Sequence, residues 1–224
     1  MISFLGKNLD LLEREHTMKL SSCWIIVALF VNGLSMNSVL AAGNIEAGKQ
    51  KSAVCAACHN IDGNSTVPAW PKLAGQHQAY LVKQLKEYKL GEAGPRYDPQ
   101  MIGMVANLTE QDMQDLSAYF SNQKQTPGKA LSDYVKLCEK IYRGGNVVTG
   151  VAACTACHGP KGAGNLLAKY PKVSGQHADY TEAQLKAFRD KKRHNDINGI
   201  MQDIAKRMTD EEIKAVSQYI AGLH

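Results

Sequence analysis

The amino-acid sequence predicts an all-α protein built from two tandem helical domains that follow an N-terminal export segment. A long internal duplication predicts the two domains, because its unit is too long for a solenoid repeat and has the size of a small domain. Apolar residues in both copies recur at helical spacing, and no run alternates convincingly with the period of a strand. An apolar N-terminal stretch without charge predicts the export segment.

Residues 1–42 have the organisation of a secretory signal peptide. Residues 24–31 form an apolar run that a lysine precedes and small residues follow, as expected ahead of a cleavage site. The charged residues before Met18 add nothing to this signal, so we expect translation to start at Met18. This segment would direct export to the periplasm, and its cleavage is expected near residues 41–43. An uncleaved membrane anchor is the alternative, although polar residues dilute the segment.

The duplication defines two domains, residues 43–125 and 131–224. The heptapeptide that begins at Pro71 recurs at Pro171 with an offset of 100, and matched residues continue to the end of both units. Residues 121–130, with a proline–glycine pair at their centre, are expected to link the two domains.

Both units are expected to contain the same elements in the same order: a helix, a cysteine-containing pentapeptide, a glycine-rich loop, a middle helix, a methionine loop and a final helix. Apolar spacing places the middle helices at residues 78–90 and 179–191. The final helices are predicted to begin at Thr109 and Thr209, where each threonine caps a turn rich in acidic residues.

The pentapeptide Cys-x-x-Cys-His occurs once in each unit and is the attachment signature of c-type haem. A zinc site needs four ligands within one small module, and a thioredoxin-like centre needs a strand–helix context that the flanking sequence lacks. We therefore expect two covalently bound haem c groups, which would also complete the cores of two short domains. The expected thioether residues are Cys55, Cys58, Cys154 and Cys157, and the expected iron-ligating histidines are His59 and His158.

One cysteine of the predicted mature chain, Cys138, is left without a role. It falls in a helix predicted over residues 132–143, where a small buried residue is the plain interpretation. An intermolecular disulfide and a thiolate ligand to iron are the alternatives.

A second protein ligand on each iron would favour electron transfer, whereas an open iron can bind oxygen or peroxide. Met101 and Met201 are the only methionines downstream of the pentapeptides that recur in both units, so we expect them to complete the coordination. His77 and His177 also recur and are competing candidates. A hydrogen bond near the haem edge, or a helix start, is the alternative role for these histidines.

A proline follows each ligating histidine, Pro71 by 12 residues and Pro171 by 13. Its carbonyl could accept a hydrogen bond from the second ring nitrogen of His59 or His158, which would fix the ring orientation and the tautomer. A plain turn is the alternative interpretation.

From about residue 43 to its end, the chain resembles the dihaem cytochromes c4, which consist of two class I cytochrome c domains in tandem. The resemblance rests on residues 54–59, 71–76, 107–109, 143–145 and 217–224. It implies two class I cytochrome c domains, each wrapped around one covalent haem. It also implies the axial pairs His59 with Met101 and His158 with Met201, in agreement with the repeat.

The resemblance further implies a periplasmic carrier of single electrons from a quinol-oxidising bc-type complex towards terminal oxidases, with other cytochromes as further partners. We expect no catalytic residues and no nucleic-acid binding, and peripheral membrane association is possible. A cytochrome subunit of a flavocytochrome-type sulfide dehydrogenase is an alternative. A dihaem peroxidase or thiosulfate dehydrogenase is a further alternative. Either enzyme would need an open iron site or an iron ligand that a substrate can displace.

The formal charge of +5 is unevenly divided. Residues 43–130 carry 9 basic and 8 acidic groups, and residues 131–224 carry 14 and 10. The excess comes largely from Arg189, Lys191, Lys192, Arg193 and His194. This segment is expected to be either a solvated helix end or a docking patch for an acidic redox partner.

Overall fold

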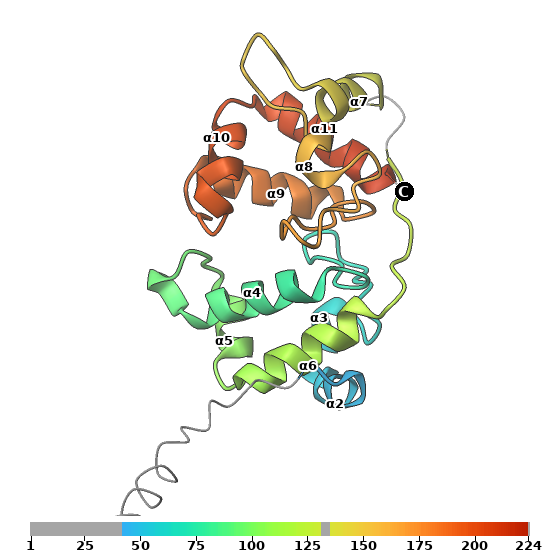
Figure 1. The fold of residues 1–224 in the computed structure, drawn as a ribbon, viewed down its shortest axis with the longest axis vertical. Helices are drawn as coiled ribbons and strands as arrows, with labels where there is room; N and C mark the ends of the chain where they lie inside the picture. The colour runs from blue at the N-terminus through green and yellow to red at the C-terminus, as the bar shows by residue number, and fades with distance from the viewer. Residues whose placement is uncertain (1–41, 131–134, 224) are drawn as a thin grey trace, which may run out of the picture. The chain divides into compact units, whose positions relative to one another are not determined.

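The structure, a computed structural model, describes residues 42–130 and 135–223 (Figure 1). The side chains of residues 135–138, including that of Cys138, lie outside the described part of the chain. All of the expected signal peptide except its last residue also lies outside it. No helix within the described residues is long and apolar enough to cross a membrane.

The first unit consists of helices joined by irregular loops: α2 (Ile45–Lys51), α3 (Ala53–His59), α4 (Gln78–Lys89), η1 (Gly91–Ala93), α5 (Pro99–Val105) and α6 (Glu110–Ser121). The second unit repeats this order with α7 (Val135–Gly144), α8 (Thr155–His158), α9 (Ala178–Arg189), η3 (Ile197–Gly199), α10 (Ile200–Lys206) and α11 (Asp210–Gly222). The only β pairing among the described residues is a set of three isolated bridges. The expected all-α class is therefore confirmed.

The final helices begin where the sequence predicts. The side chains of Thr109 and Thr209 accept hydrogen bonds from the backbone N–H groups of Asp112 and Glu212, and those two carboxylates bond back to the threonine N–H groups. These reciprocal capping boxes satisfy backbone donors that a helix start leaves open. The middle helices α4 and α9 begin within one residue of the predicted N-termini. They end one and two residues before the predicted C-termini.

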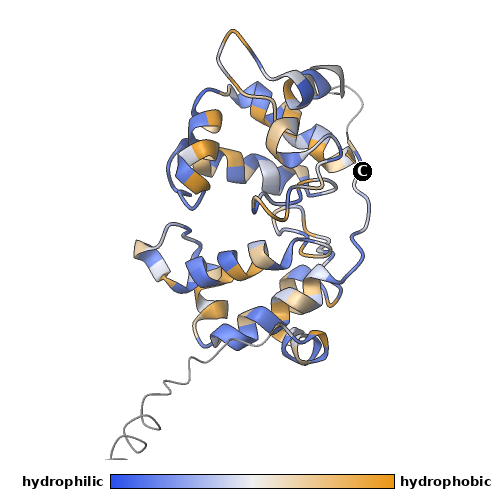
Figure 2. Cartoon of the chain, viewed as in Figure 1, coloured by the Kyte–Doolittle hydropathy of each residue, from blue (hydrophilic) through white to orange (hydrophobic). Residues whose placement is uncertain are grey.

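Each unit has its own core around its final helix. In the first, α6 packs against α2 and α4, and Leu81, Leu116, Tyr119 and Phe120 form the centre. In the second, α11 packs against α7 and α9 around a larger cluster that includes Tyr142, Ile213 and Val216. Figure 2 shows the corresponding two-sided colouring of the helices, with apolar and polar residues alternating around each. Cys55 and Cys154 pack at the edges of these cores.

The expected methionine loops are wrong in one respect, since Met101 and Met201 each lie in the first turn of a short helix. In the first unit, Asp98 caps α5 by accepting from two backbone N–H groups, and a proline occupies the first helical position. In the second, Gly199 adopts a left-handed conformation immediately before α10. Helices of seven residues show too little apolar periodicity to be recognised from sequence.

Residues 41–224 form one compact unit, and a reciprocal pair of glutamines joins its two halves. The Gln76 amide bonds the backbone of Lys172, its Nε2 donating to the carbonyl (2.8 Å) and its Oε1 accepting from the N–H (3.0 Å). The Gln176 amide makes the same two bonds to Lys72, at 2.9 and 2.8 Å. These four bonds, which we call the glutamine clamp, relate the halves by approximate two-fold symmetry.

Candidate haem-binding sites

The histidine of each pentapeptide is held by a proline carbonyl. The His59 Nδ1 atom lies 2.8 Å from the carbonyl oxygen of Pro71, and His158 Nδ1 lies 2.9 Å from that of Pro171. A carbonyl can only accept, so Nδ1 carries the proton and Nε2 keeps a free lone pair for a metal. Burial lowers the pKa of both histidines, which favours the neutral, ligating form.

A tight glycine turn brings each proline back to its histidine. The carbonyl of Gly63 accepts from the N–H groups of Leu73 (2.7 Å) and Ala74 (3.2 Å). The carbonyl of Gly162 makes the same pair of bonds in the second unit, at 2.8 and 3.0 Å. Both glycines have positive φ, and a Cβ on Gly63 would lie 2.8 Å from the Phe120 ring. Only glycine fits this conformation and this space without strain.

The four pentapeptide cysteines are free thiols and half-buried. Burial raises the pKa of Cys55 and of Cys154 to about 11. A disulfide-exchange centre needs a lowered thiol pKa, so the thioredoxin-like alternative is not supported. The described residues also contain no group of three or more His, Cys, Asp or Glu side chains placed to hold a metal ion, which is what a zinc site would need.

These residues fit a covalent haem. Each site offers two unpaired thiols on a short helix or at its N-cap, a buried neutral imidazole with one nitrogen free, and the edge of an apolar core. Leu73 and Leu108 line that edge in the first unit, and Val173 and Ile204 do so in the second. The haem would complete these cores, as the short length of each unit predicts.

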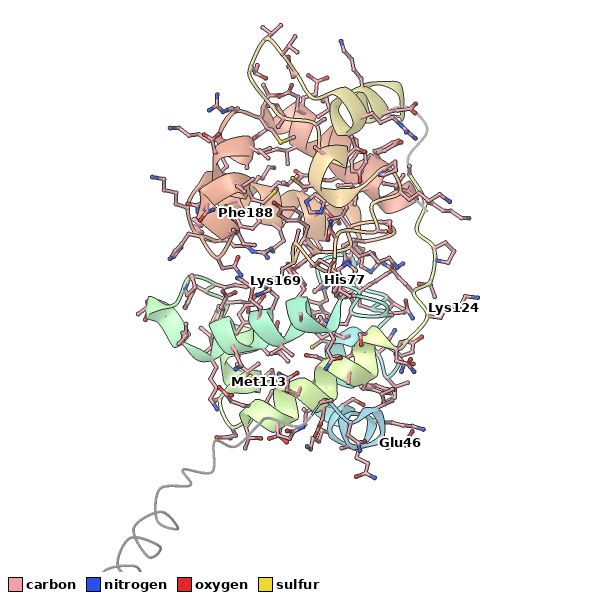
Figure 3. The ribbon with its side chains drawn as sticks, in the orientation of Figure 1. Glu46, His77, Met113, Lys124, Lys169 and Phe188 are labelled. Carbon is pink, nitrogen blue, oxygen red and sulfur yellow. The ribbon has the colours of Figure 1, made fainter. Side chains whose placement is uncertain are left out.

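The methionines differ in burial. Met113, which Figure 3 shows on α6, is 2% exposed, and Met208 is 4% exposed, so both belong to the cores. Met104 is 43% exposed. Met101 and Met201 are half-buried, and Met201 packs against the same core as Cys154.

The recurring histidines start the middle helices, as one of the sequence interpretations expects. His77 and His177 are the N-cap residues of α4 and α9. The His177 Nε2 atom lies 2.9 Å from the carbonyl oxygen of Ser65, so this nitrogen donates and is occupied. His77 (Figure 3) differs, because its buried Nε2 has no hydrogen-bond partner among the described residues. Ligation of an iron through Nε2 of His177 would have to break the Ser65 bond.

The expectation that Arg193 belongs to a solvated or docking surface is wrong. Arg193 is 7% exposed and bonds to residues of both units, while its neighbours Lys191 and Lys192 are exposed. Its partner in the first unit, Arg96, is 4% exposed. The two arginines are offset by 97 residues rather than 100, so the repeat does not pair them. A shift in register in the loops after the middle helices brings them into correspondence.

Comparison with known proteins defines the class. The Cytochrome c family model matches residues 45–124 and 143–224. The chain therefore belongs to the cytochrome c family and contains two tandem cytochrome c domains.

More particularly, the chain is a member of the cytochrome c4 family. It is 46% identical over 207 residues to cytochrome c4 of Azotobacter vinelandii, covering 89% of this chain and 97% of that one. It is 51% identical to cytochrome c4 of Thiocapsa roseopersicina, covering 81% and 93%. The crystal structure of reduced recombinant cytochrome c4 from Pseudomonas stutzeri matches with a TM-score of 0.79 and 48% identity, covering 82% of this chain and 100% of that one. The protein is thus a dihaem electron-transfer cytochrome whose cofactors are two covalent haem c groups.

Proposed function

We propose that this protein carries single electrons in the periplasm, from a quinol-oxidising bc-type complex to terminal oxidases or other respiratory acceptors, with both irons closed by protein ligands. Each haem supplies one iron that cycles between the ferrous and ferric states. His59 and Met101 would hold that iron in the first unit, and His158 and Met201 would hold it in the second. Cys55, Cys58, Cys154 and Cys157 form the thioethers.

The observation that carries this proposal is the repeated proline–histidine bond. It supports a ligating Nε2 in both units, because Nδ1 is occupied as a donor to a carbonyl. A methionine thioether on the other face gives a higher reduction potential than a more basic ligand, which suits a late electron carrier.

Replacement of one methionine tests the assignment. Met101→His is expected to lower the potential of the first haem and leave that of the second nearly unchanged in a potentiometric titration of the holoprotein. The near-infrared band of methionine–iron coordination should fall to half its intensity, and Met104→His, at an exposed position, serves as the control. Equal movement of both potentials would contradict the assignment, as would a full band in Met101→His.

Carbon monoxide separates a carrier from an enzyme. A closed iron in the reduced native protein should not bind carbon monoxide at neutral pH, whereas a peroxidase or thiosulfate dehydrogenase needs an iron site that opens. Rapid binding by one haem would refute the carrier assignment for that unit.

A second donor is suggested by two more distant relatives. Proteins named thiosulfate dehydrogenase electron acceptor, from Thiomonas intermedia and Stutzerimonas stutzeri, are 34% and 32% identical to this chain and covered over 79% and 94% of their lengths. A sulfur-oxidising dehydrogenase is therefore an alternative electron donor. Stopped-flow reduction of the oxidised protein by such an enzyme and by a bc-type complex would rank the two.

A further inference from the structure

A single peptide group lies between His59 and the second unit. The Pro71–Lys72 peptide accepts a hydrogen bond from His59 Nδ1 at its carbonyl (2.8 Å), and its N–H donates to Gln176 Oε1 (2.8 Å). The Gln176 Nε2 atom donates to the next carbonyl along the chain, that of Lys72 (2.9 Å). The peptide that holds His59 is therefore itself held by a residue of the opposite unit.

The second unit has the same arrangement with the units exchanged. The Pro171–Lys172 peptide accepts a hydrogen bond from His158 Nδ1 (2.9 Å), and its N–H donates to Gln76 Oε1 (3.0 Å). The Gln76 side chain is buried, which shelters these bonds from water. In both units, two consecutive hydrogen bonds through one peptide group connect the histidine to a glutamine of the opposite unit.

Hydrogen bonds on the two sides of a peptide group strengthen each other. An acceptor at the N–H polarises the peptide and makes its carbonyl a better acceptor. A better acceptor at Nδ1 makes the imidazole more basic, so that Nε2 donates more electron density to a metal. Stronger donation favours the ferric over the ferrous state and lowers the reduction potential of a haem.

A second link from the opposite unit reaches the loop before Pro71. His177 donates from Nε2 to the Ser65 carbonyl (2.9 Å). The Ser65 hydroxyl lies 3.0 Å from the same Nε2 and donates to the carbonyl of Trp70 (2.6 Å), the residue before Pro71. The second unit therefore holds the segment 65–72 at both of its ends.

The corresponding loop of the second unit closes on itself. Asn165 and Tyr170 exchange both backbone hydrogen bonds at 2.9 Å, and Tyr170 is the residue before Pro171. His77 (Figure 3), which corresponds to His177, has a buried Nε2 without a hydrogen-bond partner among the described residues. The histidine loop of the first unit thus depends on the opposite unit more strongly than that of the second.

We infer that Gln176 and His177 are positioning residues for the first haem, and Gln76 for the second. Each glutamine orients the peptide that bonds the histidine of the opposite unit and strengthens that bond, which lowers the potential of the haem there. His177 supports the same peptide in the first unit alone. This role depends on the proposed ligation of iron by His59 and His158.

Potentiometric titration of holoprotein variants tests the crossed assignment. Gln176→Met keeps the length of the side chain and removes its hydrogen bonds, so the potential of the first haem should rise and that of the second should stay nearly unchanged. Gln76→Met should give the reverse. Gln78→Met is the matched control, because its amide contacts Gln114 of its own unit at 3.5 Å, and it should leave both potentials at native values. Met101→His identifies which potential belongs to the first haem.

Hydrogen exchange measured by NMR gives a readout at the histidines themselves. In the reduced holoprotein, the Nδ1 proton of His59 should exchange about 2- to 10-fold faster in Gln176→Met than in the native protein, the factor that one lost hydrogen bond implies. The Nδ1 proton of His158 should keep its native rate. His177→Phe leaves the clamp intact and should act in the same sense on the first haem only. His77→Phe is its matched control and should change neither haem.

The crossed pattern distinguishes this role from simple loosening of the interface. Equal movement of both potentials in Gln176→Met and in Gln76→Met would overturn the inference, as would native potentials and exchange rates in Gln176→Met. If Gln176→Met yields no folded holoprotein, His177→Phe decides, and native values at the first haem would overturn the inference.

The proposed ligation is tested separately, on the reduced native protein. The ring protons of His59 and His158 should show the large upfield shift that the haem ring current gives to an axial ligand. Absence of that shift would refute the ligation itself. Because this measurement needs no glutamine variant, failure of the ligation and failure of the positioning role cannot be confused.

Discussion

The glutamine clamp predicts that the two domains unfold as one cooperative unit. Gln76→Ala removes two hydrogen bonds between the halves, at 2.8 and 3.0 Å, and leaves the Lys172 N–H and carbonyl without those partners. At about 1 kcal/mol for each bond, plus part of the cost of unpaired buried groups, the loss should be about 2–4 kcal/mol. The amide also accepts from the His77 N–H at 2.9 Å, so part of this loss belongs to the start of α4.

The assay is denaturant unfolding of the holoprotein followed separately by absorbance of the two haems. The native protein should show coincident transitions, whereas Gln76→Ala should separate them and lower the midpoint of the less stable domain. Gln78→Ala, two residues away at the start of the same helix, is the control, since its amide makes only a 3.5 Å contact to Gln114 within its own unit. If the two variants behave alike, the clamp does not hold the domains together.

A double-mutant cycle extends this test. Gln76 and Gln176 make four separate bonds to different backbone groups, so each single variant should weaken the interface by a similar amount. If both act on one association equilibrium, the second loss should be smaller in the double variant, because the interface is already open. Strict additivity would mean that the domains remain docked without the clamp.

Three further changes test local features. Gly63→Ala should destabilise the protein by well over the roughly 1 kcal/mol that an alanine in the left-handed conformation costs, because its Cβ meets a core ring. Gly91→Ala, also at positive φ but in open space, should cost only that amount. Equal losses of the two variants in thermal unfolding would contradict the packing argument. Hydrogen bonds from Lys51 and the helix cap lower the pKa of Asp112 to about 2, so the ionised carboxylate stabilises the fold above about pH 4 and this stabilisation is lost as the pH falls towards 2. Lys51→Gln should reduce the fall in the free energy of unfolding over this acidic range. An unchanged dependence on pH would refute the assignment. Thr209→Ala should lower the free energy of unfolding by about 1 kcal/mol through loss of the cap of α11, and restoration by Thr209→Ser but not by valine would identify the hydroxyl as the cause.

The sequence alone predicted the features that depend on residues close together in the chain. The spacing of the reactive groups in Cys-x-x-Cys-His indicates a covalent haem. Thr109 and Thr209 indicate helix starts because their capping hydrogen bonds span only three residues. The duplication indicated two domains and paired Met101 with Met201. Short-range features of this kind depend on neighbours along the chain, so one sequence is enough to recognise them.

The arrangement between the halves could be read only from the tertiary structure. Gln76 and Gln176 stood out as repeated residues, but nothing in their spacing indicated that each would bind the backbone of the other unit. Arg193 looked like one more cation in a basic run, and nothing in the sequence singled out Arg96. Their burial and their bonds to the opposite unit depend on contacts between residues about 100 positions apart. The shift in the repeat register between Arg96 and Arg193 meant that the sequence did not pair them. Bonds within a helix or turn follow from local order, whereas the meeting of two buried cations is decided by how the completed domains pack.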